Sequence, residues 1–443
     1  MSQDRVRALR EFVCMTQNQL KTPDHRKKLA IIGSGISGLG AASVLHASHH
    51  VTLYEANPTL GGHSRTVEVP TQDGSIAVDT GFIVFNKRNY PLLTRLFEFH
   101  HIPIAPSDMS FGVSIDHGWL EYGTRHALGL FAQKRNLLRV QFWKMIFDIL
   151  KFNQTARRFL HSDPSISLGD CLHHLGMGSW FRNYYLLAMG GAIWSMPLNQ
   201  MLDFPAHSFL RFFDNHGLLT VADHPQWYTV VGGSRSYVAR LGETYCDQIY
   251  LGRAAQKIWR ADGHVCVQDQ TGATHVYDDV VLACHADQAR AIIADPTPQE
   301  DHVLTAFRYQ KNTAILHSDV SFMPSRPSAW ASWVYLSDQQ SDTAPQVSLS
   351  YWMNNLQPLK TKTPLFVTLN PGRMPDPATV YDMHEFEHPV FDENAIRMQD
   401  QIETIQGQNR LWFCGAYQRY GFHEDGLLSA VQMAKKMGYA PIW

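Results

Sequence analysis

The order of apolar and polar positions divides the chain into segments of different character. The run "KLAIIGSGISGLGAASVLHASHHVTLYEA", residues 28–56, predicts an apolar strand, a glycine turn, a helix and a second strand. Residues 101–224 have a helical and aromatic pattern. Residues 301–404 contain the strand-like runs "NTAILHSDV", "SAWASWVYL", "QVSLSYWMN" and "PLFVTLN", separated by turn residues. Within them, "MPDPATVYDMHEFEHP" is the most loop-like segment.

The glycine turn has the spacing G-x-G-x-x-G, formed by Gly33, Gly35 and Gly38. In a strand–turn–helix unit the first glycine permits the tight turn, the second lets a pyrophosphate approach, and the third lets the helix pack on the strand. The helix N-terminus then presents free N–H groups to the phosphates. Glu55 ends the second strand, where a carboxylate can accept ribose hydroxyls. An acid here argues against NADP, so FAD and NAD remain.

The residues that follow resemble the flavin amine oxidase superfamily. "EANPTLGGHSRTVEV" matches its E-A-x-x-x-x-G-G-R segment and "VDTGFIVFN" its later D-x-G. His63 stands where that superfamily usually has arginine, and Arg65 is the candidate to take over the pyrophosphate contact. Gly232 and Gly233 resemble the turn with which the superfamily re-enters its FAD domain, and no second dinucleotide fingerprint for NAD(P)H follows. The resemblance implies FAD as the cofactor.

Near the end of the chain, "FCGAYQRYGFHEDGLLSA" resembles the last strand of the superfamily and the helix beside the flavin ring. Glu424 and Asp425 are then expected at a helix N-terminus, where acids complement the dipole. Gly426 is expected to let backbone N–H groups approach the pyrimidine end of the flavin. Because His423 and these two acids are consecutive, they do not converge on one ion, and no metal site is predicted.

The resemblance implies a set of cofactor-contacting positions, spread over five stretches of the sequence. They are Gly33, Gly35, Ile36, Ser37, Gly38, Glu55, Ala56, Gly61, Gly62, His63, Ser64, Arg65, Thr80, Gly81, Phe82, Ala255, Gly415, Glu424, Asp425, Gly426 and Leu427.

The resemblance also implies the domain organisation. We expect an α/β fold in which a Rossmann-like FAD-binding domain is interleaved with an α+β substrate domain, as in flavin amine oxidases and p-hydroxybenzoate hydroxylase. The FAD-binding domain would comprise residues 28–100, 225–300 and 405–443, after an N-terminal extension of residues 1–27. Residues 101–224 and 301–404 would form the substrate domain and its lid. A length of 443 residues agrees with two domains.

Composition excludes several functional classes. The formal net charge is −2 without a long basic block, so nucleic acid is not an expected partner. The six cysteines form no CxxC pair, which supports neither zinc nor a disulfide framework. Because no signal-peptide core and no apolar run of about 18–20 residues occurs, we expect a cytoplasmic protein. Aromatic residues make up 12% of the chain, which favours a large apolar cavity or a lipid-facing surface.

The stretch "KRNLLRVQFWKMIFDILKFNQTARRFL" has apolar residues at helical spacing and a basic face. The first interpretation is a lid helix packed on the core. The second is an interfacial helix at the anionic surface of the inner membrane, through which a lipid enters. Both interpretations remain open at this point.

Further phrases, including "GGAIWSMP", "SYWMNNLQ" and "VTLNP", resemble a bacterial family of FAD-dependent oxidoreductases described as predicted NAD/FAD-binding proteins. A related flavin domain precedes the methyltransferase domain of plant cyclopropane fatty acid synthases. The resemblance implies a lipid or other apolar substrate, a role in fatty acid modification, and a lipid methyltransferase as partner.

No catalytic residue is identified, because hydride transfer to flavin N5 needs positioning more than a base. The substrate-cavity candidates are Trp194, Lys311, Tyr351 and Trp352, although neighbours on a strand point to opposite faces. His285 and His317 are expected to be structural. Oxidation or desaturation of a fatty acyl chain is the first functional hypothesis. The alternatives are an amine oxidase, a carotenoid desaturase, a fatty acid double-bond isomerase, and a non-catalytic flavoprotein partner of a lipid methyltransferase.

Overall fold

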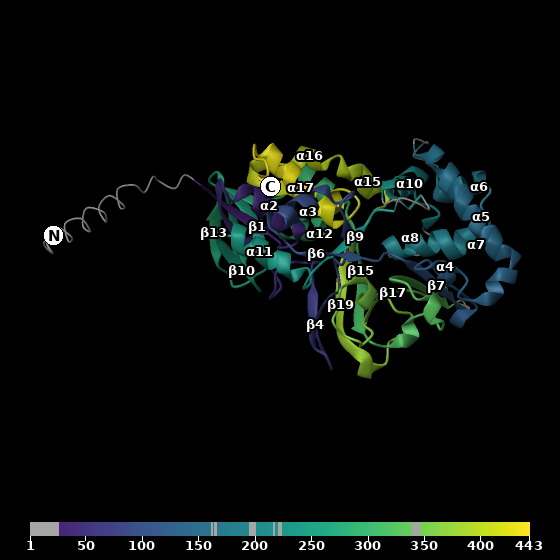
Figure 1. The fold of residues 1–443 in the computed structure, drawn as a ribbon. Helices are drawn as coiled ribbons and strands as arrows, with labels where there is room; N and C mark the ends of the chain where they lie inside the picture. The colour runs from purple at the N-terminus through teal and green to yellow at the C-terminus, as the bar shows by residue number, and fades with distance from the viewer. Residues whose placement is uncertain are drawn as a thin grey trace, which may run out of the picture.

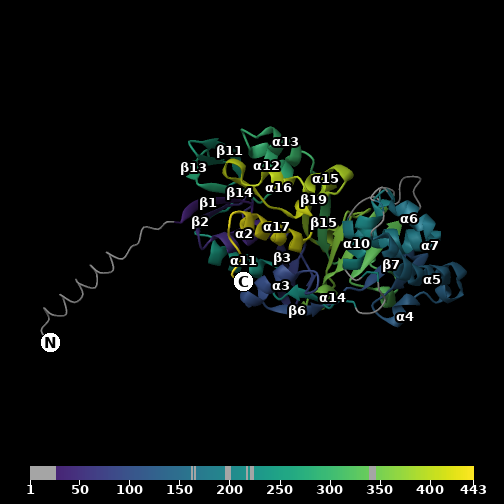
Figure 2. The same ribbon diagram turned by 90° about the horizontal axis from the view of Figure 1, so that it is seen from above.

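The computed structural model describes residues 26–443 except 161–162, 164–165, 195–200, 216–217, 220–223 and 339–345. The molecule is elongated, with a parallel sheet at one end and a group of helices at the other, as both ribbon views show (Figures 1 and 2). A second, larger sheet lies between them. The prediction of an α/β fold is therefore confirmed at the level of its layers.

The parallel sheet has five strands in the order β10-β2-β1-β14-β20. Its strands come from three separate parts of the sequence: β1 (Lys27–Ile32), β2 (His49–Tyr54), β10 (Gln248–Tyr250), β14 (Asp279–Leu282) and β20 (Leu411–Phe413). All neighbouring pairs are parallel, and β1 pairs with β2 along its whole length. Because parallel strands end at one edge, this sheet brings the glycine turn after β1 next to the segment after β20.

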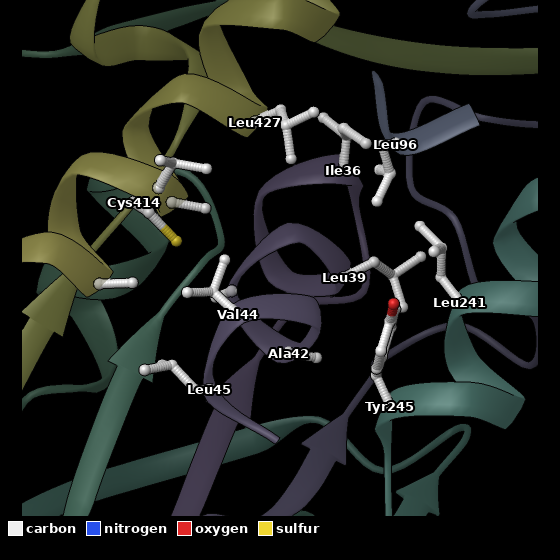
Figure 3. Close-up of a cluster of buried hydrophobic side chains, with 14 of the residues drawn as sticks. Ile36, Leu39, Ala42, Val44, Leu45, Leu96, Leu241, Tyr245, Cys414 and Leu427 are labelled. Atoms are coloured by element: carbon white, nitrogen blue, oxygen red, sulfur yellow. The ribbon is translucent and has the colours of Figure 1, made fainter. Parts of the chain in front are cut away.

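Helix α2 (Ile36–Leu45) follows the glycine turn, and all ten of its residues are buried. Figure 3 shows α2 at the centre of the core, with Leu427 and Cys414 on one side and Leu241 and Tyr245 on the other. These neighbours belong to the C-terminal helix α17 (His423–Lys436), the β20 end and α11 (Arg235–Tyr245). A helix covered on every side needs an apolar sequence without a polar face, which explains "ISGLGAASVL".

The larger sheet has seven strands in the order β19-β15-β18-β17-β16-β7-β8. The four predicted runs are confirmed as strands, although their ends differ by a few residues. The bounds are β7 (Phe111–Ile115), β8 (Leu120–Gly123), β15 (Arg308–His317), β16 (Trp333–Asp338), β17 (Gln346–Trp352), β18 (Phe366–Leu369) and β19 (Val380–Val390).

Two expectations were wrong in detail. The loop-like segment around "VYDMHEFEHPV" forms β19, which pairs with β15 over its whole length. An edge strand tolerates polar residues and a proline, because only one of its sides is hydrogen-bonded. The segment expected to be helical from residue 101 begins instead with strands β6 (Ile104–Ser107), β7 and β8. These strands are short and have Pro and Gly nearby, so the longer helical pattern that follows them determined the prediction for the whole segment.

The helices at the far end pack on a separate apolar core that includes Phe142, Phe181 and Phe209. Their bounds are α4 (Ala127–Leu130), α5 (Val140–Thr155), α6 (Leu168–His174), α7 (Ser179–Phe181), α8 (Leu187–Trp194) and α10 (Ala206–Asn215). Among the described residues, no helix is both long and apolar enough to cross a bilayer.

Smaller elements complete the fold around the two sheets. The strands are β3 (Thr66–Thr71), β4 (Gly74–Asp79), β5 (Phe85–Asn86), β9 (Trp227–Val230), β11 (Ala255–Ala261), β12 (His264–Asp269) and β13 (Thr274–Tyr277). The remaining helices are α3 (Pro91–Phe99), α12 (Ala286–Ile292), α13 (Pro298–Leu304), α14 (Met353–Leu356), α15 (Glu393–Gln399) and α16 (Ile402–Ile405).

Candidate cofactor site

Two glycines of the turn after β1 are required by the fold itself. Gly33 has φ +104°, and a Cβ there would lie 2.9 Å from the Ala283 carbonyl oxygen. A Cβ on Gly38 would lie 2.0 Å from the Gly33 carbonyl oxygen. Both positions therefore exclude a side chain whether or not a ligand is present.

Gly35 is different, because nothing in the protein explains its missing side chain. Its backbone (φ −64°, ψ −178°) is one that any residue adopts, and a Cβ would meet no atom within 4 Å. Gly35 is also the N-cap of α2, which has no side-chain cap and no acid in its first turn. By contrast, Ser167, Thr297 and Asp392 cap α6, α13 and α15. An open, uncapped N-terminus fits an anionic group, and the pyrophosphate of FAD is such a group.

Glu55 lies directly beside this turn and is 7% exposed. Its carboxylate accepts hydrogen bonds from Ser34 N (3.0 Å), Ser34 Oγ (2.5 Å), Asn57 N (2.9 Å) and Asn57 Nδ2 (3.1 Å). The Gly61 N–H in turn donates to Ser34 Oγ at 3.0 Å. Glu55 therefore fastens the glycine turn to residues 57–61. That it also accepts ribose hydroxyls stays a prediction.

Ala56 continues directly from Glu55, and Ala255 opens β11 on the same side of the parallel sheet. The Arg253 N–H donates to the Glu55 carbonyl oxygen at 2.9 Å, and the Gly252 N–H to Asn57 O at 2.9 Å. These bonds bring the β10–β11 connection to the end of β2. They support the expected position of Ala255 near the adenine end of the cofactor, which stays a prediction.

Arg65 has a protein partner that the sequence did not indicate. Its Nη1 and Nη2 donate to the Asp382 carboxylate on β19 at 2.7 and 2.9 Å, and Nη1 also donates to Thr80 Oγ1 at 3.2 Å. A two-bond arginine–carboxylate pair is directional and strong. This geometry commits Arg65 to joining the loop before β3 to β19 of the larger sheet, and so it does not support the expected role at the pyrophosphate.

A double-mutant cycle tests this assignment. We expect Arg65→Gln and Asp382→Asn each to lower the free energy of unfolding by about 1–3 kcal/mol, and the double variant to lower it by little more than one of them. Urea unfolding of the four proteins measures the coupling. We also expect both single variants to change FAD affinity equally. A loss of affinity confined to Arg65→Gln would instead support a phosphate contact.

His63 begins a cluster of rings between the Gly61–Gly62 turn and the larger sheet. Its ring centroid lies 5.1 Å from Phe386, 5.3 Å from His388 and 6.2 Å from His285. His285 also stacks on Tyr309 at 4.2 Å. Burial lowers the pKa of His63 to about 3 and that of His388 to about 4, so both rings are neutral at physiological pH. A neutral imidazole thus occupies the position where the superfamily usually has a cationic arginine.

His388 and Phe386 were not among the residues predicted for the site. In β19 alternate residues share a face, and "HEFEH" places His384, Phe386 and His388 together. His388 is fixed further, since Asn312 Nδ2 donates to its Nδ1 at 2.7 Å. This alternation could have predicted a strand with three rings on one face, but the polar composition of the segment favoured a loop instead.

Ser64, Phe82 and His423 meet at the start of α17, together with Tyr237, which sequence analysis also missed. The His423 Nε2 atom lies 2.6 Å from Tyr237 OH and 3.1 Å from Ser64 Oγ, and the two hydroxyl oxygens are 2.5 Å apart. Phe82 stacks flat on the His423 ring with centroids 3.8 Å apart. Burial lowers the pKa of His423 to about 3. The neutral ring is therefore linked through Nε2 to both hydroxyl groups of this network.

Thr80 and Gly81 hold the loop that carries Phe82. The Thr80 N–H donates to Arg65 O at 2.9 Å and the Phe82 N–H to His63 O at 2.8 Å. A Cβ on Gly81 would lie 2.1 Å from the His63 carbonyl oxygen, so this approach requires glycine. The two loops, residues 61–65 and 80–82, therefore form one unit in front of α2.

Glu424 and Asp425 serve as helix caps. Glu424 accepts hydrogen bonds from Leu92 N (2.8 Å) and Leu93 N (3.0 Å) at the start of α3, and Asp425 accepts one from Phe422 N (3.0 Å). Burial raises the pKa of Glu424 to about 7 and that of Asp425 to about 6. The predicted placement at a helix N-terminus is correct, and Glu424 additionally ties α17 to α3.

The structure explains Gly426 by packing of α17 on α2. A Cβ at Gly426 would lie 2.8 Å from both Ile36 Cγ2 and Ser37 Oγ, and its N–H already donates to Phe422 O. Leu427 is fully buried between the same two helices. Gly415 lies two residues after β20, and its N–H donates to Ser429 Oγ at 2.9 Å. These residues bring the two helix N-termini together, and a direct contact with the flavin stays a prediction.

The three substrate-cavity candidates whose side chains are described do not gather in one place. Lys311 is largely exposed on β15 and pairs with Glu385 of β19 at 3.4 Å. Tyr351 packs on Trp333, whereas Trp352 packs on Trp330 across the other face of β17. The expected opposition of Tyr351 and Trp352 is therefore present. The side chain of Trp194 lies outside the described residues.

The assembled site has an open helix N-terminus at one end and a cluster of neutral rings at the other. No group of histidine, cysteine or acidic residues among the described part of the chain could hold a metal ion. A hollow of about 390 Å³ beside α3 contains none of the predicted cofactor residues. The residues present fit an extended dinucleotide cofactor, which they would hold from Glu55 past Gly35 towards His63 and His423.

Comparison with known proteins agrees with this geometry. A family described as an NAD(P)-binding Rossmann-like domain matches residues 31–99. An L-amino-acid oxidase from Bothrops jararacussu is 44% identical over 57 residues, which are 13% of this chain and 12% of that protein. The chain thus matches only a small part of these relatives' length.

Solved structures match far more of the chain. A CLA-producing fatty acid isomerase from P. acnes aligns with a TM-score of 0.66 and 15% identity, covering 93% of this chain and 98% of that chain. A putrescine oxidase aligns with a TM-score of 0.65 and 13% identity, covering 93% and 98%. The chain therefore has the fold of these proteins, a Rossmann-like domain interleaved with an α+β domain, as the sequence predicted.

Proposed function

We propose that this chain binds FAD and is an oxidoreductase of the flavin amine oxidase type that oxidises or desaturates a fatty acyl lipid. The observation that carries the proposal is the uncapped N-terminus of α2 at Gly35, the one turn glycine that packing does not require. The adjoining unit of residues 61–65 and 80–82 supports it, as does the fold shared with oxidases and an isomerase.

The residues have distinct tasks in this proposal. The α2 N-terminus binds the pyrophosphate, while the loops around His63 and Phe82 and the start of α17 enclose the ring end of the cofactor. FAD, when bound, supplies a hydride acceptor at N5. The neutral rings of His63, His388 and His423 exclude water and add no charge beside the reacting carbon.

The neutral surroundings favour an apolar substrate over an amine. An aromatic pair that faces the flavin is what an amine substrate would call for, and Tyr351 and Trp352 cannot supply it from opposite faces of β17. Among the solved structures with this fold, one is by its title a fatty acid isomerase and another a putrescine oxidase. Both substrate classes are thus compatible with the fold, and the side chains favour the lipid.

Anaerobic titration of the flavin-loaded protein tests the proposal. We expect loss of flavin absorbance with an acyl phospholipid and none with putrescine. Bleaching by a polyamine or a carotene precursor alone would contradict the lipid assignment. Product formed without bleaching or oxygen consumption would indicate a double-bond isomerase. A flavin that no substrate reduces, while a lipid methyltransferase depends on the protein, would indicate the non-catalytic alternative.

A further inference from the structure

One side of the helical end exposes large apolar side chains in unusual number. Of the 16 large hydrophobic residues that are exposed in the described part of the chain, seven lie between residues 128 and 150. They are Leu128, Leu137, Leu138, Val140, Trp143, Phe147 and Leu150. A segment of 23 residues thus holds almost half of them, far beyond the scattered exposure that is normal for a soluble surface. We call this set the α4–α5 surface.

On helix α5 the exposed apolar residues recur at helical spacing. Val140, Trp143, Phe147 and Leu150 follow helical spacing along one stripe, and Val140 and Phe147 are 76% and 64% exposed. On the opposite side Phe142, Met145 and Phe152 are buried in the helical core. The helix is therefore apolar on two faces, and the described part of the chain covers only one of them.

Charge around the α4–α5 surface has a single sign. Lys134, Arg135, Lys144 and Lys151 are exposed beside the apolar stripe. The only acid between residues 127 and 160 is Asp148, which is buried and accepts a hydrogen bond from Gly178 N at 3.0 Å. The whole chain has a formal net charge of −2, so this basic, apolar surface contrasts with the rest of the molecule.

The position of the surface leaves the cofactor site free. Both ribbon views place α4 and α5 at the end of the molecule opposite the parallel sheet and α2 (Figures 1 and 2). A flat partner can therefore contact α5 without covering the glycine turn. Because no described helix could cross a bilayer, such contact would lie in the interface plane.

We propose that the α4–α5 surface docks on an anionic lipid bilayer, with Val140 and Phe147 inserted among the acyl chains and the lysines on the headgroups. The basic charge is complementary to anionic phospholipid, and the apolar stripe is what a bilayer rather than an acidic soluble partner requires. The docking itself is independent of the cofactor. Its purpose, access to a fatty acyl substrate, rests on the function proposed above.

Co-sedimentation of the full chain with vesicles tests the docking. We expect binding to equimolar phosphatidylglycerol and phosphatidylcholine, weakening with salt, and none to phosphatidylcholine alone. Val140→Ser/Phe147→Ser and Lys134→Glu/Lys144→Glu should each weaken binding by roughly tenfold or more. The matched controls Val276→Ser/Met383→Ser and Lys360→Glu change exposed residues elsewhere and should bind as the wild type does.

Two further readouts separate the outcomes. Thermal unfolding and flavin content of every variant show whether it is folded and loaded. If the protein binds vesicles but contains no flavin, the docking proposal stands and the proposed function is refuted. If a substrate reduces the flavin but the protein does not bind vesicles, the proposed function stands and the docking proposal is refuted. If the Val140→Ser/Phe147→Ser variant binds vesicles as tightly as the wild type does, the docking proposal is wrong. A wild-type dimer that becomes monomeric in that variant would overturn it in favour of a second copy of this chain.

Discussion

Gly35→Val is expected to fold like the wild type and to lose FAD affinity by roughly 100-fold, about 2.7 kcal/mol. The new Cβ meets no protein atom within 4 Å and suits the extended backbone of this residue, so we expect the packing of the turn to be kept. The same space is where a pyrophosphate would approach the α2 N-terminus. Thermal unfolding without cofactor measures the first effect, and fluorescence titration of FAD measures the second.

Gly38→Ala provides the contrast within the same turn. Its Cβ would meet the Gly33 carbonyl oxygen at 2.0 Å, so we expect lost stability and little folded protein, with or without FAD. Gly35→Val and Gly38→Ala thus separate a glycine kept for a ligand from one kept for the fold. Equal destabilisation of both variants would refute this distinction.

His317→Gln is expected to change how stability depends on pH. Burial lowers the pKa of His317 to about 4, and its hydrogen bonds define a neutral ring: the Asp319 N–H donates to Nδ1 (3.2 Å), and Nε2 lies 2.7 Å from Thr368 Oγ1. The folded pKa lies below the unfolded value of 6.5, so the contribution of a neutral ring is complete above pH 6.5 and is lost as pH falls towards 4. The loss amounts to about 3 kcal/mol.

The difference between wild type and His317→Gln isolates this group. Asp79, Glu424 and Asp425 have pKa values raised by burial, and they oppose the histidines by favouring the folded state as pH falls. We expect the stability gap between the two proteins, measured by urea unfolding, to shrink by about 2.5 kcal/mol between pH 7.5 and 4.5. A constant gap for His317→Gln would contradict the neutral buried ring.

Local sequence was sufficient to predict the glycine turn, because a strand, a helix and an acid at set distances leave few alternatives. Partners distant in sequence were not predictable. Arg65 contacts Asp382, which is 317 residues away in the sequence, and the His63 ring packs against His388 on β19. Each of these contacts depends on how the larger sheet meets the parallel sheet, which no local pattern specifies.

Gly426 is another residue whose contacts with a distant segment were not predictable from the sequence. The sequence indicated a glycine at a helix start beside the cofactor, and the helix start is present. The structure adds that Gly426 lets α17 approach α2, since a side chain would meet Ile36 and Ser37. A bulky substitution at Gly426 would therefore disturb helix packing before it tests flavin binding. Gly35 is the cleaner position for that purpose.

The binding isotherm of FAD to the folded, cofactor-free wild type and to Gly35→Val tests the central claim most directly. Saturable binding of one FAD per wild-type chain, with affinity reduced by roughly 100-fold in a Gly35→Val protein of unchanged thermal stability, is the predicted result. Equal FAD affinity of the two folded proteins, or no binding by the folded wild type, would contradict it.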